Sequence, residues 1–397
     1  ENNFAAQERN VLLGELELFL SFLEYNRIGD MSKRHRKALE LLNGPADLIN
    51  VKSAWTFGSP SVLYMFWRES GKLDEAIAEL DESIPFYCQL TRGHGTGADL
   101  MLRAEAHLYR GETEEAERLC YRAMITAENQ KQISICQCGA FTLARLAMIK
   151  RDKQMLEDSC AALKRMRRYN GEDFCRNIFA LADGYLAILS GEEDRVEPWL
   201  AEGRINDRLL FIVQPFAYIV YGRILIQRRE YQKLLGLSEY MMAVSSIFPN
   251  LLPQIYLRIY SAQAFYGLEN FKEAISQLRE AFELALPDRI LLPFSENYEG
   301  IQQLLADSLF HEEVRRTIER LVSKTGGEEE GQDGKIVELT FRERQVLNLI
   351  ARDMTNQQIA DEIYISLSSV KKHVSSLLEK FDVTSREMLK NENIRDK

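Results

Sequence analysis

The sequence predicts an all-α protein with a long array of helical hairpins followed by a small bundle of short helices. Three observations lead to this fold class. Turn signals recur between residues 29 and 270 at a period near 40, and such a period is typical of stacked helical hairpins. The stretch from Leu339 to Arg386 contains four helix-start signals. Its apolar residues then recur at helical spacing.

Composition fits a soluble globular protein of two or three domains. The chain has 397 residues, of which 46% are hydrophobic and 28% are charged, with a formal net charge of −10. Residues 336–397 contain ten basic and ten acidic side chains, so the remainder, with 50 − 10 = 40 basic and 60 − 10 = 50 acidic, carries the whole charge. Any binding of nucleic acid would therefore depend on a local patch.

Several classes of function find no support in the sequence. There is no phosphate-binding G-x-x-x-x-G-K-[ST] motif, no H-E-x-x-H and no Ser/His/Asp or Cys/His arrangement. We therefore expect no enzyme activity, no cofactor and no metal site. A signal peptide and an apolar run of eighteen residues are also lacking, so we expect a cytoplasmic protein with no membrane partner. Six cysteines fall in apolar helical patterns and are expected to be buried: Cys88, Cys120, Cys136, Cys138, Cys160 and Cys175.

The stretch near the end of the chain predicts four short helices. A capping box places a hydroxyl at the helix start and a Glu or Gln three residues later. A lone Ser is a simpler N-cap. The second and third helices are separated only by Tyr364 and Ile365, which is the spacing of a helix-turn-helix. The predicted caps are Thr340 with Glu343, Thr355 with Gln358, Thr384 with Glu387, and Ser366 alone.

One face of the third helix suits contact with DNA. Short hydroxyl side chains and two lysines match base edges and phosphates. The same features also occur in proteins that do not bind DNA, because trihelical units are common and a Lys-Lys pair often lies on a solvated face. The residues opposite the apolar stripe are Ser368, Ser369, Lys371, Lys372, Ser375 and Ser376.

This stretch resembles the LuxR-type (GerE-type) helix-turn-helix of bacterial transcription regulators. It departs from the family at Asp353 and Asp382, which replace glycines, and at Gln358, which replaces a glutamate. Asp tolerates the left-handed conformation, so we expect the same fold. The matching residues are Leu339-Thr340, Arg342-Glu343, Val346-Leu347, Ala351, Asn356, Ile359-Ala360, Ile365-Ser366, Val370-Lys371, His373, Val383 and Arg386.

The resemblance implies a role for each matching position. Lys371, Lys372 and Ser375 would face the major groove of double-stranded promoter DNA. The helix opened by Thr384 would form a homodimer contact, and RNA polymerase would be a further partner. The residues implied to approach phosphates at the helix starts are Thr355, Asn356, Ser366, Ser368 and Ser369.

The preceding chain repeats itself seven times, between about Ala5 and Leu286. A small residue recurs seven positions before most of the turns, and it would let paired helices approach closely. Arg145 and Arg223 share another repeat position, where they line the inner face or pair with acids. The turn signals are Gly29-Asp30, Gly71-Lys72, Gly111-Glu112, Arg151-Asp152, Gly191-Glu192, Arg229-Glu230 and Glu269-Asn270.

These repeats resemble the tetratricopeptide-type repeats of MalT-like regulators, without the nucleotide-binding module that precedes them in that group. The repeats, the prolines at 287 and 293, the Gly- and acid-rich composition of 323–335 and the LuxR resemblance divide the chain into four parts. These are a TPR-like superhelical solenoid (1–286), a helical cap (287–322), a flexible acidic linker (323–335) and the LuxR-type domain (336–397). Because the chain starts at Glu1 and not at methionine, we expect either a piece of something longer or a family member that dispenses with ATP.

An effector site is predicted in the irregular loop between Leu90 and Leu100. Arg92, His94 and Thr96 lie among three glycines there, and exposed N–H groups could hold an anion or small ligand. The alternative is an ordinary loop between helices. Together these features predict a sequence-specific DNA-binding transcriptional regulator whose repeats sense an effector or protein partner. The alternative is a TPR-like interaction scaffold with a weak or vestigial DNA-binding head.

Overall fold

A computed structural model of the chain describes residues 2–49, 54–167, 173–205, 208–247, 249–305, 315–316, 318–319, 322, 341–363, 365–381 and 383–389. Every regular element within these residues is a helix, which confirms the all-α class for this part of the chain. The chain divides into an N-terminal unit, Glu1–Gly326, and a C-terminal unit, Gly327–Lys397. The predicted cap beyond residue 305 lies largely outside the described residues, and the predicted linker lies wholly outside them.

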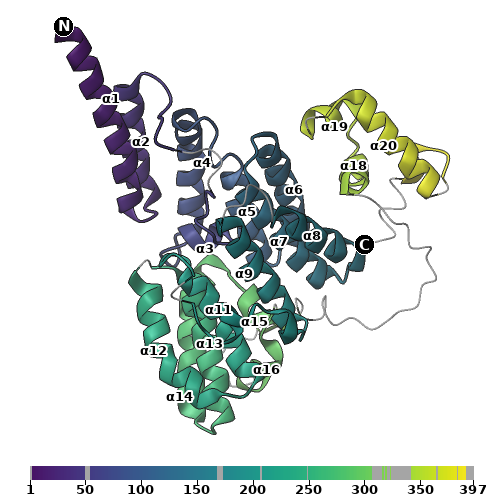
Figure 1. Ribbon diagram of the computed structural model, residues 1–397. Coiled ribbons are helices and arrows are strands. Elements are labelled where there is room, and N and C mark those ends of the chain that lie inside the picture. Colours follow the sequence, from purple (N-terminus) through teal and green to yellow (C-terminus); the bar gives the residue numbers. More distant parts are fainter. Residues whose placement is uncertain are drawn as a thin grey trace. The chain divides into compact units, whose positions relative to one another are not determined.

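The N-terminal unit is built mainly from neighbouring helices that are joined by short turns and pack against each other (Figure 1). The regular pairs are α1 (Asn2–Ser21) with α2 (Ile28–Leu42), α5 (Ala98–Arg110) with α6 (Thr113–Asn129), α7 (Ile133–Lys150) with α8 (Lys153–Met166), α11 (Gln214–Gln227) with α12 (Tyr231–Ile247), and α13 (Leu251–Gly267) with α14 (Phe271–Ala285).

Two of the seven expected hairpins are irregular. In the second, α3 (Val62–Phe66) has only five residues before α4 (Leu73–Leu90). In the fifth, α9 (Asp173–Leu189) is followed only by two short helices, η3 (Glu193–Arg195) and α10 (Pro198–Ala201). Helical pairs are therefore observed, whereas a regular solenoid of seven TPR-like repeats stays a prediction.

The first helices of successive pairs form one continuous layer. Helices α5, α7, α9, α11 and α13 each contact the next. Ala104, Ala144 and Ala262, at the predicted small positions, are fully buried. At Gly222 an added Cβ would lie 2.8 Å from the Tyr260 ring, so glycine is needed for the close approach of α11 and α13. These contacts agree with the role expected from the repeat pattern.

The first turn lies elsewhere than the sequence predicts. Gly29 and Asp30 belong to the first turn of α2, which begins at Ile28. The chain reverses earlier, at Tyr25 and Asn26, whose φ angles are 49° and 63°. Asn tolerates this left-handed region, and a glycine inside a first helical turn is no turn signal. The Gly29-Asp30 prediction was wrong for that reason.

After α14, the chain returns to the second pair. Asp288, which ends η4 (Leu286–Asp288), accepts hydrogen bonds from the backbone N–H groups of Gly71 and Leu73 at 2.7 and 2.9 Å. It thereby satisfies donors at the start of α4. The Trp67 indole N–H donates to the same carboxylate at 2.8 Å, and the Leu291 N–H donates to the Tyr109 carbonyl at 2.8 Å. We expected residues 287–322 to cap the last repeat, but their first part lies against earlier helices.

The same segment continues through α15 (Leu292–Ser295) into a buried polar cluster. The Arg145 guanidinium, with 3% exposure, pairs with the Glu296 carboxylate at 2.8 Å. It also donates to the hydroxyl of Tyr109 at 2.9 Å. Burial lowers the pKa of Arg145, but the Glu296 charge and the surrounding tyrosines Tyr109, Tyr185 and Tyr256 together more than offset that effect, and the net shift is upward. Of the two alternatives for Arg145, pairing with an acid is therefore the one observed.

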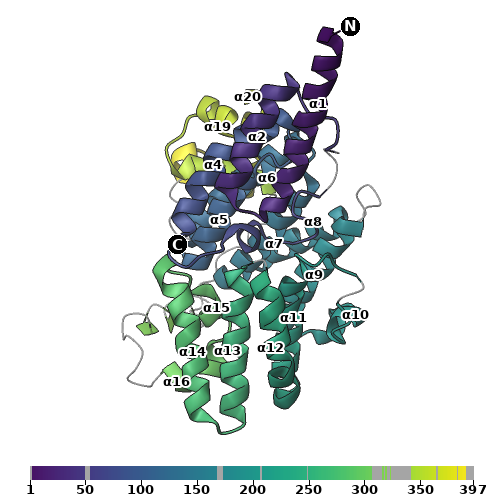
Figure 2. The same ribbon diagram turned by 90° about the vertical axis from the view of Figure 1, so that its left-hand side faces the viewer.

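Among the described residues, Arg223 at the equivalent repeat position contacts the same segment and pairs with no acid. Its guanidinium donates to the side-chain oxygen of Asn297, and the Gln263 amide donates to that oxygen at 3.1 Å. The Asn297 amide donates in turn to the Pro293 carbonyl at 2.7 Å. Beyond Asn297, α16 (Tyr298–Leu305) packs on α13 and α14 (Figure 2). Residues 288–297 thus join the last hairpin to helices far earlier in the chain.

Among the described residues, α7 is the one helix that is long and apolar enough to cross a membrane. However, 83% of its 18-residue window is buried inside the N-terminal unit, as in the core helix of a folded domain. The described residues contain no cluster of His, Cys, Asp and Glu that would hold a metal ion. Four of the six cysteines are buried, and Cys88 and Cys160 are partly buried.

Candidate nucleic-acid interface

The C-terminal unit contains α18 (Phe341–Ala351), α19 (Asn356–Glu362) and α20 (Leu367–Lys380), followed by a helical turn at residues 386–389 (Figure 1). Each helix places an apolar stripe in a common small core, as its spacing predicts. The fully or nearly fully buried residues are Val346, Leu347, Leu349, Ile350, Ile359, Ala360, Ile363, Val370, Leu377 and Leu389.

Helix α19 begins with the predicted capping box. The Thr355 hydroxyl accepts from the Gln358 N–H at 3.3 Å, and the Gln358 side-chain oxygen accepts from the Thr355 N–H at 2.8 Å. The Gln in place of the family's Glu therefore still closes the box. Asp353, just before it, has a φ of 61°. Its left-handed conformation is the one we expected where the family has glycine.

A short connection places the start of α20 close to the end of α19. The Ile365 N–H bonds back to the Ala360 carbonyl at 3.1 Å. The Ser366 hydroxyl then caps α20 by accepting from the Ser369 N–H at 3.1 Å. Ser368 also lies within 2.8 Å of that hydroxyl. Because the first N–H groups of a helix and its dipole favour anions, these two capped starts suit phosphate oxygens.

The outer face of α20 presents the predicted basic side chains to solvent. Lys371, Lys372 and Ser375 are exposed, while Val370 and Leu377 on the opposite side are buried. Within the described residues, no carboxylate forms an ion pair with Lys371 or Lys372. The Ser375 hydroxyl donates to the Lys371 carbonyl at 3.0 Å. Sequence reasoning therefore placed the exposed lysines correctly on one face.

Ser376 does not belong to that outer face, although the sequence pattern grouped it there. Its hydroxyl donates to the Glu343 carboxylate of α18 at 2.5 Å, and Lys380 pairs with the same carboxylate at 2.6 Å. Glu343 is only 4% exposed, so these contacts fix α18 against α20. The predicted partner of Glu343 in a capping box, Thr340, lies outside the described residues, as do Tyr364 and Asp382.

The Asn356 side chain is engaged inside the unit. The Arg386 guanidinium donates both to the Asn356 side-chain oxygen and to the Met354 carbonyl. Burial lowers the pKa of this arginine. Arg386 thus holds the start of α19, a positioning role that sequence reasoning assigned to no residue. Asn356 is half-buried, and its amide oxygen is already used.

The last helix begins one residue later than predicted. The Met388 N–H donates to the Ser385 hydroxyl at 3.3 Å, so Ser385 and not Thr384 is the N-cap. The Thr384 hydroxyl instead lies 3.7 Å from the Met388 sulfur. Both residues carry a capping hydroxyl, and only the backbone path of the preceding turn selects between them. Helical residues are described from 386 to 389.

The three predicted effector residues do not converge on one site. Arg92 pairs on the surface with Asp47 at 2.7 Å, and the Thr96 hydroxyl donates to the Gly93 carbonyl at 2.6 Å. His94 is buried at 6% exposure, and its Nδ1 lies 2.8 Å from the Tyr87 hydroxyl. The N–H groups of His94, Gly95 and Thr96 all donate within the fold. This loop is therefore not built to expose N–H groups to an anion.

Comparison with known proteins agrees with the geometry of the C-terminal unit. The family model described as bacterial regulatory proteins of the luxR family matches residues 337–390. The chain carries a C-terminal LuxR-family helix-turn-helix domain. The match covers the two capped helices and all eight predicted DNA-binding residues, whereas the helical pairs of the N-terminal unit lie outside it.

Individual relatives match only part of this chain and part of their own length. The transcriptional regulatory protein LiaR of Bacillus subtilis is 44% identical over 48 residues, which are 12% of this chain and 23% of LiaR. The spore germination protein GerE of B. subtilis is 42% identical over 48 residues, 12% of this chain and 65% of GerE. A nitrate/nitrite response regulator protein homolog of Haemophilus influenzae is 34% identical over 100 residues, 25% of this chain and 41% of that protein. No solved structure matches the chain.

Proposed function

We propose that this protein is a sequence-specific DNA-binding transcriptional regulator whose N-terminal helical unit senses an effector or a protein partner. One observation carries the DNA-binding part. Lys371 and Lys372 are exposed, have no ion-pair partner among the described carboxylates, and lie on the helix that Ser366 caps. They do so within a segment that matches a family of regulatory proteins.

In this proposal, α20 enters the major groove of promoter DNA. Lys371, Lys372 and Ser375 face base edges and nearby phosphates, while Thr355 and Ser366 with its neighbouring serines approach phosphates at the two helix starts. Two lysines give one head little affinity, so two heads joined through the helix after Ser385 bind paired half-sites. The protein acts in the cytoplasm and influences RNA polymerase at the bound promoter.

Three features support a sensing role for the N-terminal unit. It holds most of the chain, it carries a formal charge of −7 (39 basic and 46 acidic side chains) out of the chain's −10, and it contains an apolar cavity. A body with a net charge and an apolar cavity is suited to binding a partner. The sensing part is independent of the DNA-binding part and is tested separately.

The test is a titration of the intact chain with fragments of its source genome at several salt concentrations. Binding should favour particular fragments and should weaken as salt rises. The double variant Lys371→Ala/Lys372→Ala should lose affinity for all fragments, and its slope of log K against log salt should fall by about 2, or about 1 per lysine.

The matched control is Lys164→Ala/Lys272→Ala, which removes the same charge from exposed positions of the N-terminal unit. This control should leave the salt slope unchanged. Equal losses in both double variants would mean that net charge, and not the α20 face, drives binding. If the intact chain bound no fragment at any salt concentration, the function would instead be that of an interaction scaffold with a vestigial head.

A further inference from the structure

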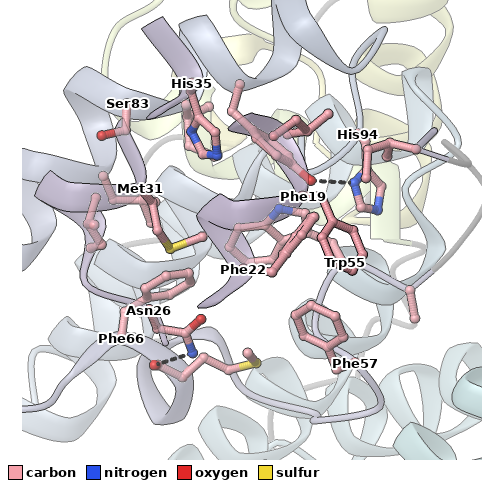
Figure 3. A pocket seen from close by; sticks show the side chains of 18 of the residues that line it. Phe19, Phe22, Asn26, Met31, His35, Trp55, Phe57, Phe66, Ser83 and His94 are labelled. Atoms are coloured by element: carbon pink, nitrogen blue, oxygen red, sulfur yellow. Dashed lines mark hydrogen bonds between the residues drawn. The ribbon is translucent and has the colours of Figure 1, made fainter. Parts of the chain in front are cut away.

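A cavity of about 500 Å³ lies within the N-terminal unit, between the first helical pair and the elements that follow it (Figure 3). Its walls come from α1, α2, the short helix η1 (Phe22–Glu24), α3 and α4, with further side chains from α9 and from four connecting segments. Protein interiors contain few voids larger than a water molecule. A hollow of this size falls in the range of pockets that hold small-molecule ligands.

The lining is rich in aromatic and sulfur-containing side chains. Figure 3 shows Phe19, Phe22, Trp55, Phe57 and Phe66 around the hollow, with Met31 beside them. Aromatic rings and thioethers make favourable contacts with other flat apolar groups. Of the described residues that line the cavity, none is Asp, Glu, Lys or Arg, so none of these described side chains would neutralise a charged ligand.

The polar side chains in the walls already make hydrogen bonds within the fold. The Asn26 amide donates to the Met65 carbonyl at 3.0 Å, and the Ser83 hydroxyl donates to the Glu79 carbonyl at 2.6 Å. The Tyr87 hydroxyl is bonded to His94. Such walls offer few groups to a sugar or a nucleotide, whose many hydroxyls or phosphates would lose their contacts with water on entry.

His35, the other histidine of the lining, adds no charge either. Its Nε2 lies 3.0 Å from the Ser21 hydroxyl, which itself donates to the Leu18 carbonyl at 2.6 Å. Ser21 therefore accepts from the imidazole N–H, which leaves Nδ1 as a bare nitrogen that is shielded from water. Burial lowers the pKa of His35 to about 4, so the ring is neutral near pH 7.

Apolar side chains at the cavity are also left exposed. Phe19, Leu48 and Leu210 are 60%, 64% and 45% exposed, although all three line the hollow. An occupant that covers them removes apolar surface from water, which is favourable in proportion to the area covered. Because these residues come from three different segments, the same occupant would link the first helical pair to the rest of the unit.

We propose that this cavity is a binding site for an uncharged, predominantly apolar small molecule. An occupant of this cavity would be the effector of the proposed function, and this identification rests on that function, whereas the cavity and its ligand class do not. Of the predicted effector residues, only His94 lines the site, whereas Arg92 and Thr96 do not. The ligand class follows from the uncharged aromatic walls, and differs from the anion suggested by the glycine-rich loop.

The test compares two fluorescent probes that differ by one charge. N-phenyl-1-naphthylamine is neutral, and 8-anilino-1-naphthalenesulfonate has the same ring system with a sulfonate added. The intact chain should bind the neutral probe saturably at one site, and should bind the sulfonate at least about tenfold more weakly, because an ionised group would lose its hydration without gaining a partner. Binding of the neutral probe should also raise the melting temperature.

Variants locate the site. Met31→Trp replaces a half-buried thioether side chain with a larger indole ring in the cavity. Because the ring fills the space, binding of the neutral probe should weaken about tenfold or more. Ile84→Phe fills it from α4 and gives a second, independent variant. The control is Ile247→Trp, which adds the same ring at a 62% exposed position of α12 outside the cavity and should leave probe binding unchanged.

Three results would overturn the cavity proposal: no saturable binding of the neutral probe, equal or tighter binding of the sulfonate, or unchanged binding by both filled variants with intact melting curves. None of these depends on DNA. If the intact chain bound the neutral probe but bound no DNA fragment, only the proposed function would be contradicted.

Discussion

The two units use their basic side chains in opposite ways. In the N-terminal unit, Arg145 is 3% exposed and is paired with Glu296, which lies 151 positions away in the chain. In the C-terminal unit, Lys371 and Lys372 are exposed, and no ion pair joins them to a described carboxylate. The buried charge holds distant parts of the chain together. The exposed charges stabilise nothing that the structure describes, and so are available to a partner.

The largest effect is expected where the buried pair is broken. Arg145→Met leaves the Glu296 carboxylate buried without its cation, and should reduce the free energy of unfolding of the intact chain by about 3–5 kcal/mol. Urea unfolding followed by circular dichroism measures this loss. Arg36→Met removes a surface pair with Glu82 and should cost less than about 1 kcal/mol. Similar losses in both variants would contradict the comparison.

A second buried carboxylate makes stability depend on pH. Glu105 of α5 is 2% exposed and accepts from Ser61 and from the N–H groups of Val62 and Leu63. Burial nevertheless raises its pKa from 4.5 to about 7. The unfolded chain therefore releases this proton first as pH rises. Stability from this group is complete below pH 4.5 and is lost progressively as pH rises to about 7.

The variant Glu105→Gln isolates this effect because it does not titrate. Measured between pH 5 and 8, the stability of the wild-type chain relative to Glu105→Gln should fall with rising pH, by at most about 1.4 kcal/mol per pH unit. It should then level off above about pH 7. If the stability of the wild-type chain relative to Glu105→Gln instead rose with pH, the three hydrogen-bond donors would lower the pKa of Glu105 by more than burial raises it.

Among the described residues of the C-terminal unit, Glu343 is a buried carboxylate that contacts Ser376 and Lys380. Glu343→Gln removes the ion pair with Lys380 while keeping the shape of the side chain, and should destabilise this unit by roughly 1–3 kcal/mol. Amide hydrogen exchange of residues 341–389 should quicken, whereas the N-terminal unit should be unaffected. Glu379→Gln, at an exposed position of the same helix α20, is the control and should change exchange little.

The smallest effect separates two neighbouring hydroxyls. Ser385→Ala should cost about 1 kcal/mol in the C-terminal unit because it removes an N-cap. Thr384→Ala should stay within about 0.5 kcal/mol, although the sequence pattern assigns the cap to Thr384. The same exchange experiment on residues 383–389 measures both. If Thr384→Ala lost more stability than Ser385→Ala, Thr384 would be the N-cap, as the sequence pattern predicted.

Much of the C-terminal unit was predictable because its signals are local. The Thr355 and Ser366 caps depend on residues three positions away, and both are present as predicted. The left-handed Asp353 likewise follows from the preference of one residue type. Prediction failed at Ser376, which the helical pattern placed outward. Its contact with Glu343 spans 33 positions, and no pattern within one helix contains that information.

Local sequence patterns were enough to predict the helical class, most of the turns between helices and the LuxR-family match, because each depends on residues a few positions apart. Tertiary structure alone decided how residues 288–297 are placed, with Asp288 bonded to Leu73 across 215 positions. It also decided which polar groups are used internally and where the apolar cavity forms. The physical reason is that burial and pairing depend on which distant surfaces meet, whereas helix caps and turns depend on the backbone of one short segment.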